Sequence, residues 1–233
     1  MQQFYTPSLL PDSNTYLFDE QESKHIARVL RKNSGESIRL TNGKGHLFWG
    51  ILEVLYPKTC SVNITRSEFV APSNVQVHMA VAPTKNMDRF EWFLEKATEL
   101  GVHRITPILC ERSERKQLKM ERCTKIISAA VKQSLRAYAP ILDALTPLKD
   151  FSTDAPVSCI AHCEDLPKIA LKKVLNNSPK SCVLVGPEGD FTPKEIEWAL
   201  AQKMQAVHLG DARLRTETAA LVALHTATLL HTS

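Results

Sequence analysis

The segment Gly186-Pro187-Glu188-Gly189-Asp190 has the composition of a tight, exposed loop that could hold a ligand. It follows the apolar run 182–185, and residues 192–195 then supply an N-cap threonine, a proline at N1 and a glutamate at N3 for a helix. Ligands of α/β proteins bind in such positions, beyond the carboxyl ends of strands. On local evidence, an ordinary strand-to-helix turn is an equally weighted alternative.

Residues 209–219 form a similar connection between a predicted strand and a helix that is apolar on nearly every side. Thr216 suits the N-cap of that helix, and Glu217 suits its first turn, where the helix dipole favours a carboxylate. Capping does not account for Arg213 and Arg215, two cations beside the start of a helix that we expect to be buried. These arginines make the segment a second candidate for chemistry.

Positive charge is concentrated in the middle of the chain. The formal net charge is +4, and residues 112–136 contain eight basic residues against two acidic ones. A helix predicted for residues 120–136 carries a basic stripe with Gln133 beside it, formed by Arg122, Lys125, Lys132 and Arg136. Phosphate contact and an ordinary solvated helix face explain this stripe about equally well.

Cys159, His162 and Cys163 are three zinc-binding side chains within five residues. On a strand, however, His162 would point away from the two cysteines, and no nearby Cys-x-x-Cys supplies further ligands. We therefore favour a half-buried strand end over a metal site. The sequence also lacks the phosphate-loop, dinucleotide-binding, Gly-x-Ser-x-Gly and His-Glu-x-x-His motifs. The absence of these motifs argues against nucleotide hydrolysis, Rossmann-type redox chemistry and serine hydrolysis.

The overall composition is that of a globular protein of one or two domains, with 233 residues, 43% of them hydrophobic and 23% charged. No apolar run approaches the roughly 18 residues that a membrane span needs, and the N-terminus lacks a secretory signal pattern. Scattered cysteines suit free thiols in a reducing compartment. We expect a cytoplasmic protein with no membrane partner.

The first 72 residues are predicted to form a small β-rich domain. Strand-like runs at 37–41 and 47–55 flank Asn42-Gly43-Lys44-Gly45, a strong hairpin signal, and residues 60–65 alternate as a further strand. Residues 20–32 have helical spacing, with Ile26, Val29 and Leu30 on one face. One short helix with several strands favours a small barrel, and residues 69–74 form the linker.

From residue 73 onward, strands and helices alternate, which predicts an α/β domain on a mainly parallel sheet over residues 73–233. Asp88 and Glu91 resemble a capping box for a helix that ends at Gly101. The predicted strands are 75–81, 105–110, 157–161, 182–185 and 206–209. The later helices are 120–136, 167–175, one starting at Thr192 and 216–230; the last is apolar nearly all round and is expected to be buried.

Taken together, these segments resemble the RsmE family of 16S ribosomal RNA uridine N3-methyltransferases, within the SPOUT class. The motifs that carry the resemblance lie along nearly the whole chain: residues 25–31, Gly35, 42–45, Lys85, 96–102, Pro107, 111–113, Gln133, Arg136, Pro140, 186–189 and 209–219. Three positions depart from the family pattern. Asp190 stands where glycine is usual, Ala212-Arg213 shifts an arginine by one position, and Lys132 replaces a common acid.

The resemblance implies a PUA-like β-barrel followed by a SPOUT-type parallel-sheet domain with a trefoil knot, which binds S-adenosyl-L-methionine and forms a homodimer. It implies methylation of N3 of a uridine in 16S rRNA of the small ribosomal subunit, without a metal. A sulfonium is a good leaving group, so the protein mainly has to position the base and help to remove its proton. The alternatives are a non-catalytic RNA-binding or ribosome-assembly protein, and a SPOUT methyltransferase for another RNA.

The same resemblance assigns roles to individual residues. The cofactor-binding candidates are Val185, Gly186, Pro187, Glu188, Gly189, Leu209, Gly210, Leu214, Arg215, Thr216, Thr218 and Ala219. Arg136 and Arg215 would hold RNA phosphate or stabilise charge on the uracil oxygens, and Glu217 would accept the proton. The RNA-binding candidates are His25, Arg28, Arg31, Lys85, Arg112, Arg122, Lys125, Lys132, Gln133 and Arg136.

Overall fold

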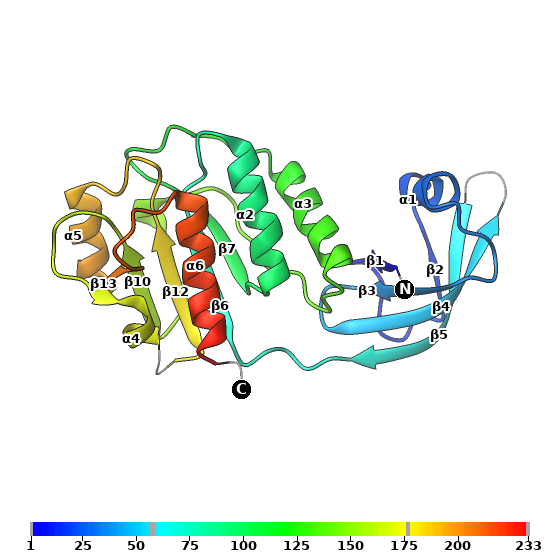
Figure 1. Ribbon diagram of the computed structural model, residues 1–233. Coiled ribbons are helices and arrows are strands. Elements are labelled where there is room, and N and C mark those ends of the chain that lie inside the picture. The colour runs from blue at the N-terminus through cyan, green and yellow to red at the C-terminus, as the bar shows by residue number, and fades with distance from the viewer. Residues whose placement is uncertain (1, 56–58, 176–177, 232–233) are drawn as a thin grey trace. The chain divides into compact units, whose positions relative to one another are not determined.

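The computed structural model describes residues 2–55, 59–175 and 178–231 (Figure 1). The chain divides into two compact units, Met1–Pro72 with Val131–Ala139, and Ser73–Ala130 with Pro140–Ser233. The sequence places a domain boundary after residue 72 but does not predict that residues 131–139 belong with the first unit. Long-range hydrogen bonds hold them there, such as Gln3 Nε2 to the Arg136 carbonyl at 2.9 Å and the Tyr138 hydroxyl to the Val70 carbonyl at 2.8 Å.

The first unit is built on a five-stranded sheet in the order β1-β3-β4-β5-β2. Its strands are β1 (Gln3–Tyr5), β2 (Thr15–Leu17), β3 (Ser37–Thr41), β4 (His46–Leu55) and β5 (Thr59–Phe69). Only β1 and β3 pair in parallel. Alternate residues of β3 to β5 point into one core, which includes Ile38, Phe48 and Val62. The predicted hairpin strands are present, whereas β1 and β2 are too short for their pattern to be read.

The helix predicted for residues 20–32 is shorter and changes its winding. Helix α1 (Glu20–Lys24) is followed by a π-helical turn (His25–Val29), in which the Leu30 amide donates to the His25 carbonyl at 2.9 Å. This wider turn rotates the later side chains. Ile26 is therefore fully buried while Val29 is 67% exposed, so the predicted shared apolar face of these residues is wrong.

The second unit contains a parallel sheet of short strands, as predicted. Its order is β11-β13-β10-β12-β6-β7-β8, with β9 also pairing to β7. Every recorded pair in this sheet is parallel. The strands are β6 (Gln76–Val81), β7 (Arg104–Leu109), β8 (Ile141–Leu142), β9 (Thr146–Pro147), β10 (Val157–Ala161), β11 (Ile169–Ala170), β12 (Lys180–Val185) and β13 (Gln205–His208).

Helices lie on both faces of this sheet: α4 (Leu171–Leu175) and α6 (Thr216–Leu229) on one face, with α2 (Met87–Leu100) beside α6, and α5 (Pro193–Ala201) on the other. Helix α3 (Met120–Gln133) spans the division between the units, because its last three residues belong to the first unit. Ala80 of β6 and Leu184 of β12 pack in one cluster with Ile196 of α5. The intervening strand residues, such as Met79 and Val183, face the opposite side, where α6 lies against β6 and β12 and beside α2 (Figure 1).

Several helix ends differ from the predicted ones. Asn86, not Asp88, is the N-cap of α2, because its side chain accepts from the Asp88 amide at 3.0 Å. Gly101 ends that helix in the left-handed region, as predicted. Helix α3 stops at Gln133, and Leu135 has a φ of +56°. Arg136 therefore follows the helix and does not extend the predicted stripe.

Two further helices also need correction. The segment predicted as a helix over 167–175 begins with strand β11, and α4 starts only at Leu171. Helix α6 is not wholly buried: Leu221 and Val222 are half-buried, and Leu229 is 62% exposed. Part of the apolar surface of α6 is therefore exposed in this chain. None of the described helices is both long and apolar enough to cross a membrane.

A buried polar network stabilises the end of the sheet where β6 and β7 begin. The ring of His78 contacts the Thr106 hydroxyl through Nε2 at 2.7 Å and the Thr153 hydroxyl through Nδ1 at 3.3 Å. Thr106 donates its proton to Asp143, which also accepts two hydrogen bonds from Arg104 at 2.7 and 3.0 Å. Since the Thr106 proton is already used, Nε2 of His78 must be the donor to that hydroxyl. Burial lowers the pKa of His78 to about 4, so the imidazole is neutral at pH 7.

This network predicts acid-sensitive stability. In the unfolded chain the pKa of His78 returns to about 6.5, so below that pH the unfolded state binds a proton that the folded state does not. The His78 contribution is complete above pH 6.5 and falls by up to about 3 kcal/mol as the pH drops through 4. In urea denaturation at pH 7 and pH 4.5, His78→Gln should be less stable at pH 7 and lose less stability on acidification. The exposed His225→Gln is the control, and an unchanged pH dependence in His78→Gln would contradict the assignment.

Candidate active site

Three loops meet at the carboxyl edge of the parallel sheet. They follow β10, β12 and β13, and β10 lies between the other two strands in the sheet. Because neighbouring parallel strands end at the same edge, loops that are distant in sequence come together there. They line a cavity of about 870 Å³. The lining residues are Arg112, 161–165, Lys168, 185–190, 207–216 and Ala219.

A hydrogen bond joins the two loops that the sequence singled out. The Thr216 hydroxyl donates to the Gly186 carbonyl at 3.1 Å, and both residues are buried. Thr216 was expected to be the N-cap of α6, but Arg215 occupies that position without a side-chain cap. The hydroxyl of Thr216 is instead used to fasten the start of α6 to the loop after β12.

Glycine suits both loops for different reasons. A Cβ atom at Gly186 would lie 3.1 Å from the ring of Phe191, a tight contact that would require the ring to shift by a few tenths of an ångström. Gly210 has open space around it but adopts a φ of +123°, a backbone conformation that side chains disfavour. The tight turns inferred from the sequence are therefore present, one for reasons of packing and the other for reasons of backbone geometry.

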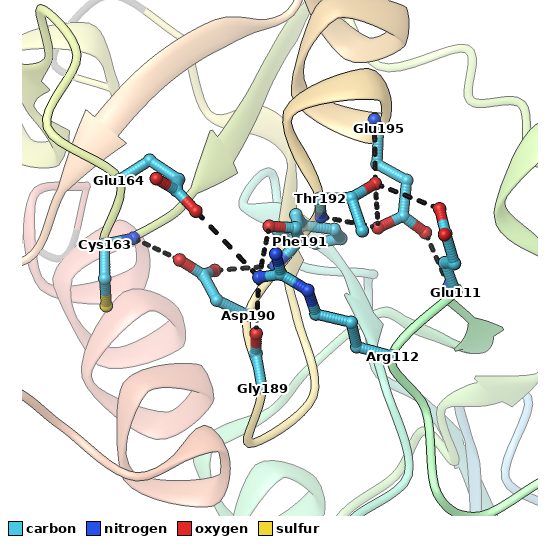
Figure 2. A network of polar contacts seen from close by, with 9 residues as sticks. All are labelled: Glu111, Arg112, Cys163, Glu164, Gly189, Asp190, Phe191, Thr192 and Glu195. Carbon is cyan, nitrogen blue, oxygen red and sulfur yellow. Dashed lines mark hydrogen bonds and ion pairs between the residues drawn. The ribbon is translucent and has the colours of Figure 1, made fainter.

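Arg112 holds the loop after β12 in place. Figure 2 shows its guanidinium group among the loop carbonyls, with NH1 2.9 Å from the Gly189 oxygen and 3.3 Å from the Phe191 oxygen. The same nitrogen lies 3.9 Å from a carboxylate oxygen of Glu164. The resemblance assigned Arg112 to RNA, and this stays a prediction; in this structure its guanidinium group positions a cavity wall.

Asp190 connects the loop after β12 to the loop after β10. Its backbone has a φ of +62°, which aspartate tolerates better than most residues. One carboxylate oxygen accepts from the Phe191 amide at 2.8 Å and the other accepts from the Cys163 amide at 2.7 Å (Figure 2). The departure from the usual glycine thus adds a side-chain link that glycine could not make.

The start of α5 is fixed by a polar cluster beside this loop. Thr192 and Glu195 form the predicted capping box, with a proline at the first turn. Glu195 also accepts a hydrogen bond from the Glu111 amide at 2.8 Å. These contacts anchor the far end of the loop, as Figure 2 shows.

His162 is a cavity residue that the sequence analysis considered only as a zinc ligand. It is 6% exposed, and neither ring nitrogen has a hydrogen-bond partner among the described residues. Burial, followed by the charge of Lys168, lowers the pKa of His162, so the ring is neutral at pH 7. No group of His, Cys, Asp and Glu in the described part of the chain is arranged to hold a metal ion. The position of His162 directly after a predicted strand was the sequence signal that could have identified it as a cavity residue.

Most of the predicted cofactor residues line the cavity, and Thr218 is the exception. Of the catalytic candidates, Arg215 lines it. Glu217 is buried outside the lining, with Oε1 3.9 Å from Nε of Arg89 and Oε2 lacking a hydrogen-bond partner among the described residues. Arg136 belongs to the first unit, where burial lowers its pKa.

The RNA-binding candidates are distributed over both units. Arg28 and Arg31 are exposed in the first unit, where His25 is half-buried. Several others carry an ion pair with an acidic residue: Lys85 with Glu114, Arg122 with Glu91, and Lys132 with Glu22. Lys125 and Gln133 are exposed on α3. The Lys85–Glu114 pair is exposed on both sides, and such pairs contribute little to stability, so a phosphate could replace that carboxylate at small cost.

Comparison with known families agrees with this architecture. Residues 71–228 match an RNA methyltransferase domain, and residues 18–65 match an RNA methyltransferase PUA domain. The parallel sheet, the cavity at its carboxyl edge and these matches are those of an RNA methyltransferase of the SPOUT class. The predicted PUA-type first domain and α/β second domain are confirmed at this level.

Similarity to individual proteins identifies the family within this class. Ribosomal RNA small subunit methyltransferase E of Bacillus subtilis is 29% identical, covering 96% of this chain and 94% of its own. Its counterpart from Synechocystis is 32% identical over 86% of this chain and 68% of its own. The crystal structure of the Neisseria gonorrhoeae enzyme bound to S-adenosyl methionine has a TM-score of 0.82 and 29% identity, over 96% of this chain and 95% of that one. The chain belongs to the ribosomal RNA small subunit methyltransferase E family, as its motifs predicted.

The role of Asp190 can be tested without any ligand. Asp190→Gly keeps the backbone conformation available but removes both carboxylate hydrogen bonds. Each is worth about 1 kcal/mol, so local opening should become several-fold more frequent. Hydrogen–deuterium exchange at Cys163 and Phe191 should rise about five- to tenfold. Asp211→Ala, at an exposed lining residue, is the matched control. Unchanged exchange in Asp190→Gly would show that the carboxylate does not tie the loops.

Proposed function

We propose that this chain is an S-adenosyl-L-methionine-dependent methyltransferase that methylates N3 of a uridine in 16S rRNA of the small ribosomal subunit. The observation that carries the proposal is the meeting of the loops at residues 186–190 and 209–216 around one cavity. Family membership and the S-adenosyl methionine bound to the Neisseria relative support it.

The cavity suits such a cofactor in size and chemistry. Its volume of about 870 Å³ lies in the range of small-molecule sites. Val185 and Val207, which line the cavity, give apolar surface for a purine. At Gly186 and Gly210 no side chain shields the backbone, so its N–H and C=O groups can contact a ligand directly.

The bound cofactor supplies an activated methyl group, because its positively charged sulfur is a good leaving group. The protein therefore has to hold the uracil in line with that methyl group and remove the N3 proton. Arg215 lines the cavity and is exposed, which supports a role in holding an RNA phosphate or in stabilising negative charge on a uracil oxygen. We propose Glu217, whose Oε2 has no hydrogen-bond partner among the described residues, as the acceptor of the proton.

The first unit is proposed to dock rRNA. Arg28 and Arg31 are exposed there, and a row that the sequence analysis missed crosses its sheet. Arg39, Trp49 and Arg66 lie directly opposite one another on β3, β4 and β5, and both guanidinium groups lie within 5.7 Å of the indole centroid. Cations combined with an aromatic ring suit phosphates and unstacked bases. The candidates Lys85, Arg112, Arg122, Lys125, Lys132, Gln133 and Arg136 are proposed to extend the RNA contact.

We also propose that the second unit is knotted. Strand β13 lies on the far side of β10 from β12 and β6, yet α6, which follows it, returns to pack on β12 and β6. The Thr216 bond to Gly186 fixes the point at which the returning chain passes the loop after β12. Threading α6 through that loop would give the trefoil knot that the family resemblance implies.

A homodimer is the proposed assembly, in the cytoplasm. Leu229 of α6 is 62% exposed, and Trp92 of the neighbouring α2 is 45% exposed. Apolar surface of this kind on two adjacent helices is suited to a second copy of the chain. All six cysteines are free thiols, which agrees with a reducing compartment.

Substitution of Arg136 tests whether this residue acts in RNA binding or in cofactor binding. Arg136→Ala should lower the rate of 16S rRNA methylation at least tenfold, because a phosphate or uracil contact is lost. Calorimetry should show S-adenosylmethionine affinity within twofold of wild type. Lys119→Ala, at an exposed cation outside the proposed RNA contact, is the control. Equal loss of both properties would refute the RNA role.

The target is tested by mapping N3-methyluridine in rRNA. A strain lacking this gene should lose the modification from 16S rRNA and regain it with the wild-type gene. Loss of the modification from a different RNA would identify that RNA as the substrate instead. If no modification is lost, the proposed methyltransferase activity is contradicted.

The proposed dimer predicts a change in mass on charge insertion. Trp92→Arg places a cation on the exposed apolar surface and should convert a dimer of about 52 kDa into a monomer of 26.1 kDa in light scattering. Leu17→Arg, at an apolar position of the first unit that is more exposed than Trp92, should leave the mass unchanged. A wild-type protein that is already monomeric would rule out the dimer.

A further inference from the structure

Glu188 connects the wall of the cavity to a second loop. It lines the cavity from the loop after β12, and its Oε1 accepts a hydrogen bond from the Lys85 amide at 2.9 Å. Lys85 belongs to the loop after β6, residues 82–86. The structure describes all five of these residues, and none of them lines the cavity. The Glu188 carboxylate therefore joins the cavity to a loop that lies outside it.

The parallel sheet brings these two loops side by side. Strands β6 and β12 are paired, with Val81 opposite Val185, and the Ala82 amide then donates to the Val185 carbonyl at 3.0 Å. Because paired parallel strands end at the same edge, both loops leave the sheet together. The Glu188 hydrogen bond is a further link between them, three residues along each chain from the first.

Lys85 is held by three polar contacts and still exposes its charge. Besides the amide bond to Glu188, its carbonyl accepts from NH2 of Arg115 at 2.7 Å, and its ammonium group lies 2.7 Å from Oε2 of Glu114. The hydrogen bond to Glu114, with the charge of that residue and of Glu188, raises the pKa of Lys85. The side chain is 72% exposed. A cation on a fixed backbone thus lies next to a residue of the cavity wall.

Charge alone does not explain a carboxylate at this position. An acid beside a cation that binds RNA repels the phosphates and weakens binding. The hydrogen bond of Glu188, however, goes to the Lys85 amide, whereas the ammonium group pairs with Glu114. A backbone contact restricts the point from which the lysine side chain projects, so less conformational entropy is lost when a phosphate binds. Positioning therefore accounts for this carboxylate where charge does not.

We propose that Glu188 is a positioning residue for RNA binding, which fixes the Lys85 backbone so that the ammonium group binds an RNA phosphate beside the cavity. This inference rests on the proposed function, in which Lys85 contacts RNA. Glu114 holds the ammonium group in the free protein, and the phosphate replaces this exposed carboxylate at small cost. Since Glu188 is also part of the cavity wall, the phosphate contact is set relative to the methyl donor.

The test measures affinity for small ribosomal subunits from a strain lacking this gene, without the methyl donor and over a range of salt concentrations. Lys85→Ala removes the ammonium group but keeps the amide that Glu188 binds. Its affinity should fall about fivefold, and the slope of log affinity against log salt should become shallower by about one. Glu188→Ala should reproduce both changes, although it removes a negative charge.

Two variants control for the loss of charge. Glu188→Gln removes the same charge but keeps an oxygen that can accept from the Lys85 amide, so its affinity should be equal to that of wild type or tighter. Glu197→Ala removes an exposed acid on α5, outside the cavity lining, and should leave the affinity and the salt slope unchanged. An equal loss of affinity in Glu188→Gln and Glu188→Ala would overturn the inference.

The double variant separates positioning from an independent contact. If Glu188 acts through Lys85, adding Glu188→Ala to Lys85→Ala should change neither the affinity nor the salt slope any further. Additive losses would overturn the inference alone, as would wild-type affinity in Glu188→Ala. Wild-type affinity in Lys85→Ala would contradict the RNA contact of Lys85 together with the inference. A wild-type protein that does not bind the subunits would contradict the proposed function itself.

Discussion

The hydrogen bond from the Thr216 hydroxyl to the Gly186 carbonyl joins segments 30 residues apart and closes the cavity on one side. Two other contacts act in the same region. The Asp190 carboxylate binds the Cys163 amide, and Arg112 holds the Gly189 carbonyl. Each of these contacts joins another segment of the chain to the loop after β12. The parallel sheet brings the strand ends to one edge, and these polar contacts determine the positions of the loops there.

Two buried histidines show how the two edges of this sheet differ. His78, near the start of β6, has both ring nitrogens in contact with threonine hydroxyls. His162, after the end of β10, has neither nitrogen satisfied among the described residues. The same residue type is therefore satisfied by neighbouring side chains at the amino edge and left without a described hydrogen-bond partner at the carboxyl edge.

The sequence was sufficient for features that depend on nearby residues. The capping box at Thr192, the end of α2 at Gly101 and the strand Val157–Ala161 are set by local patterns and were predicted correctly. Contacts between distant residues were not accessible in this way. The use of Thr216 as a link, and of Arg112 as a loop support, depends on partners that only the fold brings close. The π-helical turn after α1, which leaves Ile26 buried and Val29 exposed, is likewise not revealed by helical spacing alone.

The Asp190 side chain also affects how the cavity meets its ligand. A glycine at this position would adopt the same backbone angles readily, but it would leave the loop free to sample many others. With both carboxylate oxygens engaged, the loop is already restricted before any ligand arrives. Most of the loss of conformational entropy then occurs during folding, so association requires little further ordering of this wall.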